Sequence, residues 1–329
     1  MAHAAESPIR VSVVVPCFNA ADFVEAAVRS VLAQTLTDLE CLVIDDCSTD
    51  GTPILLARLA ADDPRVRVVT LPDNAGPSAA RNAGIDAARG EWIALLDADD
   101  AYLPHRLERL IEAAGPHDAD MMADNQIVVG HADGRDLGRA FNLAGGRPSF
   151  EIDLAYFLEH SIPVRGEYSL GYLKPIMRRA FLDRCALRYD RRYTVGEDFL
   201  LYVDALRHGA RFHVLDEAFY LYRRRPASLT RSGGWTLRVL AGMSREILDR
   251  HGLSLPKAGR RALAERHSIM TRRAQALDLA DRVRAGDPRG AAALIAREPA
   301  ALAALGRELF ALGRHRLQPG PQTSGGTAR

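Results

Sequence analysis

The chain has 329 residues, of which 47% are hydrophobic and 26% charged, with a formal net charge of +1. This length and balance are typical of a globular protein with an ample core, and near-neutral charge gives no basis for binding nucleic acid. No apolar run approaches the roughly 18 residues that span a bilayer. Residues 1–10 also lack the apolar stretch of a secretory signal. We therefore expect a cytoplasmic protein without a nucleic-acid partner.

The first 130 residues alternate between two patterns. Short apolar or β-branched runs predict buried strands at residues 11–16, 39–45, 66–71, 92–96 and 121–129. Segments with helical periodicity lie between them, at residues 21–34, 52–61, 78–88 and 106–114. Apolar strands separated by helices are typical of βαβ units. The sequence therefore predicts an α/β fold with a mainly parallel sheet sandwiched by helices.

The pattern changes beyond residue 130. Residues 131–150 are rich in Gly, Asp and Arg and are expected to form a loop or flap. Helices are expected next at 152–159 and 197–207, and short strands at 211–215 and 218–222. From residue 235 to about 317 the sequence is helical in pattern and rich in Ala, Leu and Arg.

Three of the predicted strands end in segments that could line a site, and two of the three carry acids. These ends are Pro16-Cys17-Phe18-Asn19, Asp45-Asp46-Cys47-Ser48 and Asp97-Ala98-Asp99-Asp100. Ligands of such sheets bind beyond the carboxyl ends of the strands, so we expect these segments to line one site. Carboxylate oxygens suit Mg²⁺ or Mn²⁺, and such an ion can hold a diphosphate. Acidic turns after strands are common, however, so the acids at 97–100 alone are weak support for a metal site.

Four motifs, in order, resemble those of family 2 glycosyltransferases. Residues 11–19 (VSVVVPCFN) are similar to the family's opening strand, and residues 43–52 (VIDDCSTDGT) to its DDxSxDGT turn. Residues 74–84 (NAGPSAARNAG) resemble its NxGxxxARNxG segment, and Asp97-Ala98-Asp99 falls at its DxD motif. The resemblance covers residues 10 to about 230. It implies a GT-A-type fold and an inverting sugar transfer from a nucleotide-sugar donor, assisted by Mg²⁺ or Mn²⁺.

The resemblance places donor-binding residues along the strand ends and the third helix. They are Pro16, Asn19, Asp45, Asp46, Asn74, Arg81 and Asp97. Asp46 is assigned to the nucleobase or ribose, with an Asx turn or a helix cap as the alternative. Asp45 either holds ribose or braces the turn, whereas Asp50 is better explained as an Asx turn or a helix cap.

Arg81 and the DxD acids have two interpretations each. The guanidinium of Arg81 suits a diphosphate and a neighbouring carboxylate equally well. The resemblance assigns Asp99 to the metal and Asp97 to ribose or to the metal as well. A divalent ion there would neutralise charge on the departing nucleoside diphosphate. Asp100 is expected to form a turn or a helix cap.

Two further segments complete the predicted site. Glu197-Asp198 resembles the family's ED motif, which implies that Asp198 is the general base and that Glu197 supports it or binds the acceptor. In isolation, the preference of acids for helix N-termini would explain this pair better. Arg225 stands where the family often has a His in YRxHxxS. Arginine cannot ligate a cation, so Arg225 either binds the diphosphate or belongs to a solvated basic face, which puts strict metal dependence in doubt.

The resemblance also implies the partners. These are a nucleotide-sugar donor and a saccharide or polyprenyl-diphosphate-linked saccharide acceptor, as in bacterial exopolysaccharide or envelope glycan assembly. The segment YRRRPAS at 222–228 is further reminiscent of succinoglycan-type glucosyltransferases. Basic residues near the predicted base suit a lipid-linked acceptor and peripheral association with the inner face of the cell membrane. The basic residues are Arg178, Arg179, Arg188, Arg191 and Arg192.

The expected organisation has a catalytic domain followed by helices. Its parts are a disordered N-terminus (1–10), a catalytic domain (11–232) with nucleotide-binding (11–130) and acceptor (131–232) halves, a helical region (233–317) and a disordered tail (318–329). The helical region is expected to pack on the catalytic domain, or to bind a membrane surface or partner.

Two other functions stay open. A sugar nucleotidyltransferase usually needs a Gly-rich phosphate loop after the first strand, which residues 16–19 do not offer. An inactive nucleotide-sugar-binding regulatory subunit would not need the acids Asp46, Asp97, Asp99 and Asp198.

Overall fold

The computed structural model describes residues 9–131, 134–141, 149–162, 169–224 and 233–299, together with residues 302, 303 and 306. The chain divides into two compact units. One comprises residues up to 228 and residues 254–262, and the other comprises residues 229–253 and those from 263 onward. Residues 1–8 and the predicted tail at 318–329 lie outside the described residues, so the disorder expected for them stays a prediction.

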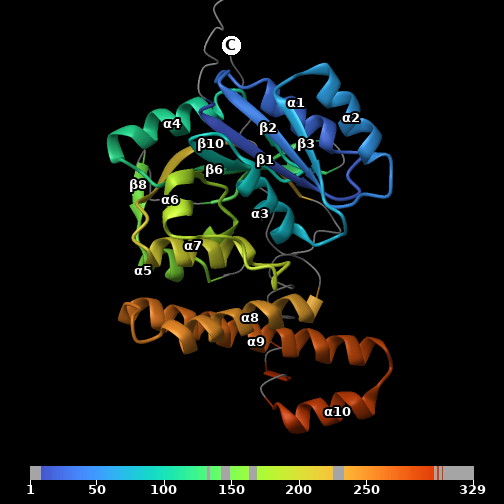
Figure 1. The fold of residues 1–329 in the computed structure, drawn as a ribbon. Coiled ribbons are helices and arrows are strands. Elements are labelled where there is room, and N and C mark those ends of the chain that lie inside the picture. The colour runs from blue at the N-terminus through green and yellow to red at the C-terminus, as the bar shows by residue number, and fades with distance from the viewer. Residues whose placement is uncertain are drawn as a thin grey trace, which may run out of the picture. The chain divides into compact units, whose positions relative to one another are not determined.

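The described residues of the first unit form a ten-stranded sheet (Figure 1). Its strands are β1 (Val11–Cys17), β2 (Leu39–Asp45), β3 (Val66–Thr70), β4 (Trp92–Leu95), β5 (Ala101–Tyr102), β6 (Met121–Gly130), β7 (Asp136–Arg139), β8 (Ser149–Ile152), β9 (Ile176–Arg178) and β10 (Phe212–Arg224). They are ordered β3-β2-β1-β4-β9-β6-β10-β5, while β7 pairs with β6 and β8 with β10.

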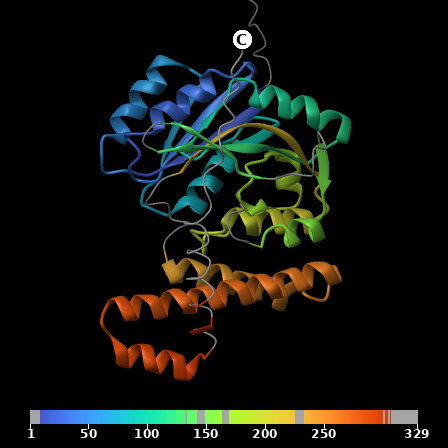
Figure 2. The same cartoon turned by 180° about the vertical axis from the view of Figure 1, so that it is seen from behind.

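Helices cover both faces of this sheet (Figures 1 and 2). They are α1 (Val24–Leu32), α2 (Thr52–Asp62), α3 (Pro77–Ala87), α4 (Arg106–His117), α5 (Leu154–Glu159), α6 (Arg179–Arg184) and α7 (Glu197–Arg207). The odd-numbered residues of β1, such as Val13, are buried in one core with apolar residues of α1, α2 and α4. Successive strand residues point to opposite faces, so the even-numbered Val14 faces α3. The predicted α/β sandwich is confirmed.

The contact between α3 and the sheet explains one of the small residues of the third motif. A Cβ atom added at Gly84 would lie 2.2 Å from Cγ1 of Val14 in β1, far inside van der Waals contact. Glycine therefore lets α3 approach β1 closely enough to hold Arg81, one turn earlier, over the strand ends.

The sheet is more mixed than the sequence predicts. The pairs β1–β2, β2–β3, β1–β4 and β6–β10 are parallel, but β9 lies antiparallel between β4 and β6. The expected loop at 131–150 contains β7 and the first residues of β8, and the two strands expected near residue 215 form the single strand β10. The short strands β7, β8 and β9 were missed because they have only three or four residues, too few for a periodic pattern. In β10 the register against β6 shifts between Val214 and Tyr220, within the stretch where the sequence predicts a break.

The second unit is helical as far as it is described. Its helices are α8 (Gly233–His251), the part of α9 (Lys257–Arg284) from residue 263 onward, and α10 (Pro288–Arg297). Arg266 of α9 donates hydrogen bonds to the Leu240 carbonyl and the Ser244 hydroxyl of α8, and Leu279 of α9 packs against Ala291 of α10. Within the described part of the chain, no helix combines the length and apolarity that crossing a membrane requires.

Candidate active site

The carboxyl ends of β1, β2 and β4 meet at one edge of the sheet. The parallel register places Cys17 beside Asp45, and Val14 beside Leu95. The segments that leave these strands therefore emerge side by side. The structure thus brings together the three strand ends that the sequence singles out.

Asp46, at the end of β2, braces the turn before α3. Its two carboxylate oxygens accept hydrogen bonds from the backbone N–H groups of Ala75 and Gly76, each at 2.8 Å. Gly76 has φ +85°, a left-handed conformation that favours glycine. Asp46 is only 4% exposed, so its first role is to shape the loop that would face a nucleotide. Direct contact between Asp46 and a nucleobase stays a prediction.

The neighbouring residues also hold the turns in place. Asp45 accepts a hydrogen bond from the Ser48 N–H at 3.1 Å, which is the bracing role expected as one alternative. Asn19, with φ +48°, accepts from the Thr49 N–H at 2.8 Å and so joins the end of β1 to the turn after β2. Asp50 accepts a hydrogen bond from the Thr52 N–H at 2.9 Å, which forms an Asx turn before α2; the N-cap of α2 is Gly51 and not Asp50.

Two more of the predicted donor residues, Pro16 and Asn74, lie on the same edge. Pro16 is the sixth residue of β1 and pairs with Ile44 of β2. Asn74 is exposed in the loop before α3. Neither position tests whether these residues contact a donor, so both stay predictions.

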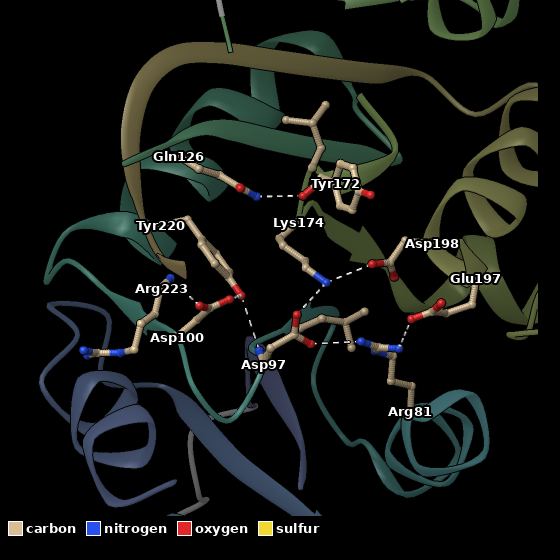
Figure 3. Close-up of polar contacts among 12 residues, drawn as sticks. Arg81, Asp97, Asp100, Gln126, Tyr172, Lys174, Glu197, Asp198, Tyr220 and Arg223 are labelled. Atoms are coloured by element: carbon tan, nitrogen blue, oxygen red, sulfur yellow. Dashed lines mark hydrogen bonds and ion pairs between the residues drawn. The ribbon is translucent and has the colours of Figure 1, made fainter. Parts of the chain in front are cut away.

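Arg81 joins two of the predicted site segments. Its Nη2 lies 2.9 Å from Oδ1 of Asp97, and its Nη1 lies 2.6 Å from Oε1 of Glu197 (Figure 3). The side chain is almost fully buried. Of the two interpretations of Arg81, the structure shows the ion pair with Asp97, and it adds Glu197 as a second partner.

Lys174 joins the same acids from the other side, and the sequence did not identify it. Its Nζ lies 2.9 Å from Oδ2 of Asp97 and 2.8 Å from Oδ2 of Asp198 (Figure 3). The other oxygen of Asp198 accepts a hydrogen bond from the Tyr189 hydroxyl at 2.9 Å. We call Arg81, Lys174, Asp97, Glu197 and Asp198 the ion-pair cluster.

The register of β9 explains the position of Lys174. Because β9 is antiparallel to β4, Ile93 pairs with Met177 and Trp92 with Arg178. Continuing that register brings residue 174 beside residue 96, directly before Asp97. One signal in the sequence points to this residue: of the 43 Lys and Arg residues, only Lys174 and Lys257 are lysines.

Within the ion-pair cluster, the electrostatics favour the charged forms of Asp97 and Lys174. Burial alone would raise the pKa of Asp97, but Lys174 and Arg81 hold it well below its ordinary value. Burial would lower the pKa of Lys174, yet Asp198 and Asp97 together raise it well above its ordinary value. Arg81 and Lys174 are therefore cationic and face the carboxyl groups of the cluster.

Asp100 has a structural position, as expected, although a strand and not a helix follows it. Its carboxylate accepts hydrogen bonds from the Tyr220 hydroxyl and the Arg223 N–H, both at 2.7 Å, and its N–H donates to the Asp97 carbonyl. Burial and the nearby carboxylates of Asp99 and Asp97 raise the pKa of Asp100 well above its ordinary value. Asp100 thus ties the acidic turn to β10.

Asp97 is less suited to a divalent cation than the sequence suggests. Asp97 and Asp99 are both partly exposed, but both oxygens of Asp97 are already paired with the side chains of Arg81 and Lys174. The described residues offer no group of three or more His, Cys, Asp or Glu that could hold a metal. Mg²⁺, however, is commonly bound by one or two carboxylates together with substrate phosphates. Arg225, the residue that raised doubt about the metal, lies outside the described residues.

Comparison with known proteins identifies the family. The profile described as Glycosyl transferase family 2 matches residues 12–181, more than half of the chain. The chain belongs to this family, as its motifs predicted. The matched range contains Asp46, Arg81, Asp97 and Lys174 but ends before Glu197.

The chain is similar to two proteins of Rhizobium meliloti (strain 1021). It is 45% identical to the succinoglycan biosynthesis protein ExoO over 221 residues, which cover 67% of this chain and 62% of that protein. It is 38% identical to the succinoglycan biosynthesis protein ExoU over 231 residues, covering 69% and 66%. The match thus spans less than two thirds of the length of either relative.

A solved structure confirms the fold. Staphylococcus aureus TarS, residues 1–349 in complex with UDP-GlcNAc, superposes with a TM-score of 0.61 at 22% identity, covering 88% of this chain and 92% of that one. The GT-A-type architecture implied by the motifs is therefore confirmed.

Proposed function

We propose that this protein is an inverting glycosyltransferase that moves a sugar from a nucleotide-sugar donor to a saccharide or lipid-linked saccharide acceptor. One observation carries the proposal. In a chain of this family, a buried ion-pair cluster joins the acidic strand end at Asp97 to the acids that begin α7. The names of ExoO and ExoU support acceptors of the exopolysaccharide type.

Asp198 is the proposed general base. It takes the proton of the acceptor hydroxyl while that oxygen attacks the anomeric carbon. The bond from that carbon to the diphosphate breaks on the opposite face, and the nucleoside diphosphate leaves. Among the described residues, each oxygen of Asp198 has one hydrogen-bond partner, so each keeps a second lone pair with which the carboxylate can accept from a hydroxyl.

The donor is proposed to lie along the strand ends. The turns held by Asn19, Asp45 and Asp46 would form the nucleoside pocket, with Pro16 and Asn74 at its walls. Asp99 would hold Mg²⁺ or Mn²⁺ against the diphosphate, and Arg225 would add fixed positive charge. The bound ion supplies charge neutralisation for the leaving group. Peripheral contact with the cell membrane is part of this proposal for a lipid-linked acceptor.

A donor panel tests the proposal. The protein is incubated with radiolabelled UDP-, GDP- and dTDP-sugars, with Mn²⁺ or with EDTA, and nucleoside diphosphate release is followed. We expect release from one nucleotide class, lowered by EDTA. Tight binding of a nucleotide sugar without release from any donor would instead indicate a binding subunit. Equal release of nucleoside diphosphate with Mn²⁺ and with EDTA would contradict the proposed role of a divalent metal.

A further inference from the structure

The backbone that carries Lys174 is held by three buried side chains from three different elements. The carbonyl groups of residues 172–174 each accept a hydrogen bond. The donors are Gln126 of β6 at 2.7 Å, Tyr202 of α7 at 2.8 Å and Arg106 of α4. Figure 3 shows the first of these next to the ion-pair cluster. Residues 172–174 precede strand β9 and so lie outside the regular hydrogen bonding of the sheet. The three side-chain hydrogen bonds to their carbonyls fix this segment instead.

The third donor is itself rigidly held. Arg106 is fully buried, and its guanidinium lies 2.8 Å from Asp124 of β6. It also stacks over the rings of Tyr102 and Tyr220, at 4.3 and 5.2 Å from their centres. The hydroxyl of Tyr220 in turn holds Asp100. The Lys174 backbone is therefore anchored to the same framework that shapes the acidic turn.

Lysine suits this place better than arginine does. An ammonium group is a compact charge with three N–H donors, whereas a guanidinium is a broad planar fork. Two of the donors of Lys174 are directed at Asp97 and Asp198, which lie on different elements. The chain uses arginine for nearly all its other basic positions, so the lysine here meets a local requirement.

We propose that Lys174 is a positioning residue that orients the base Asp198 and couples it to the donor-side carboxylate Asp97. This inference rests on the proposed glycosyltransferase function. The ammonium group of Lys174 and the hydroxyl of Tyr189 hold one oxygen of Asp198 each, which sets the plane of the carboxylate. Without Lys174, Asp198 loses one of these two hydrogen bonds and keeps the one from Tyr189. Its carboxylate can then rotate away from the acceptor.

A pair of lysine substitutions tests this role. Lys174→Met removes the charge and keeps most of the stem, and Lys257→Met, at the exposed start of α9, is the matched control. For Lys174→Met we expect kcat for transfer to fall about 100-fold, the cost of misplacing a reacting group by about 1 Å. The dissociation constant of the donor, measured by calorimetry, should stay nearly unchanged. Lys257→Met should alter neither quantity, and an unchanged kcat in Lys174→Met would overturn the proposal.

Chemical rescue separates charge from packing. In Lys174→Ala, added propylammonium should restore part of the lost kcat, because it returns an ammonium group to the space beside Asp198. Propanol fills the same space without charge and should restore nothing. Equal rescue by both compounds would show that Lys174 only fills volume, which contradicts the proposal.

A spectroscopic measurement on folded protein needs no lysine substitution. With ¹⁵N-lysine labelling, the two lysines give two ammonium signals. Asp198→Asn should shift the Lys174 signal, whereas Asp183→Asn, which removes a surface partner of Arg188, should not. An unmoved Lys174 signal overturns the inference. If wild-type protein transfers no sugar while the signal does shift, the proposed function fails and the coupling stands.

Discussion

Two groups of acids occupy the same edge of the sheet and are satisfied in different ways. On the donor side, Asp45 and Asp46 accept hydrogen bonds from backbone N–H groups. In the ion-pair cluster, Asp97, Glu197 and Asp198 face the side chains of Arg81 and Lys174. The first arrangement fixes the shape of a loop, and the second joins separate elements through charge. Substitutions in the two groups should therefore have different consequences.

The largest effect is expected at the base. Asp198→Asn keeps the shape of the side chain and removes its ability to take a proton, so transfer should fall about 10³-fold. Donor affinity should hold, because Asp198 is assigned to the acceptor side. Initial rates and calorimetry measure the two quantities. Asp204→Asn, on an outer face of the same helix, is the control and should keep full activity. Unchanged transfer in Asp198→Asn would refute the base assignment.

Removing the shared arginine should affect stability strongly. Arg81→Met leaves Asp97 and Glu197 without one partner in a buried site, which costs about 3–5 kcal/mol of the free energy of unfolding. Arg29→Met, which removes an exposed pair with Glu25, should leave the free energy of unfolding nearly unchanged. Urea denaturation provides both values. Similar values for the two variants would show that the cluster adds no more than a surface pair.

The approach of α3 to the sheet can be tested without touching any charge. Gly84→Ala forces a methyl group against Val14 and should cost about 1–3 kcal/mol by overpacking. Gly115→Ala, in α4 where no group beyond the adjacent residues and the helix's own backbone lies within 4 Å of the new methyl group, should be neutral or stabilising by up to about 1 kcal/mol. Thermal and urea unfolding compare the two. Equal effects would contradict the close packing that holds Arg81 in place.

The smallest expected effect concerns acid stability. The pKa of Asp97 is lower in the folded protein than in the unfolded chain, so its contribution is present above the unfolded value. That contribution is lost as the pH falls below 4 towards the folded pKa. The stability difference between wild type and Asp97→Asn, on the order of 1 kcal/mol, should be constant above pH 5 and shrink below pH 4. A difference that grows with acid would contradict the pairing with Lys174 and Arg81.

The sequence singles out every residue of the two groups except Lys174, but it does not predict that Arg81 also pairs with Glu197, for a physical reason. The turn after β2 and the start of α3 lie 30 residues apart, and their motifs are contiguous strings around Asp46 and Gly76. Arg81 and Glu197 are 116 residues apart and meet only through the tertiary fold. Lys174 precedes a three-residue strand whose antiparallel direction no local pattern reveals. Its rarity in an arginine-rich chain was the one available signal.

One measurement tests the division between the two groups most directly: donor affinity and transfer rate, determined side by side for Asp46→Asn and Asp198→Asn. Asp46→Asn loses one of two backbone contacts that shape the nucleoside loop, and donor affinity should fall about tenfold, equivalent to roughly 1.4 kcal/mol. The rate at saturating donor should stay close to wild type. Asp198→Asn should give the opposite result, with donor affinity preserved and transfer lost. Parallel losses of donor affinity and transfer rate in both variants would contradict the assignment of Asp46 to the donor loop and of Asp198 to the transfer step.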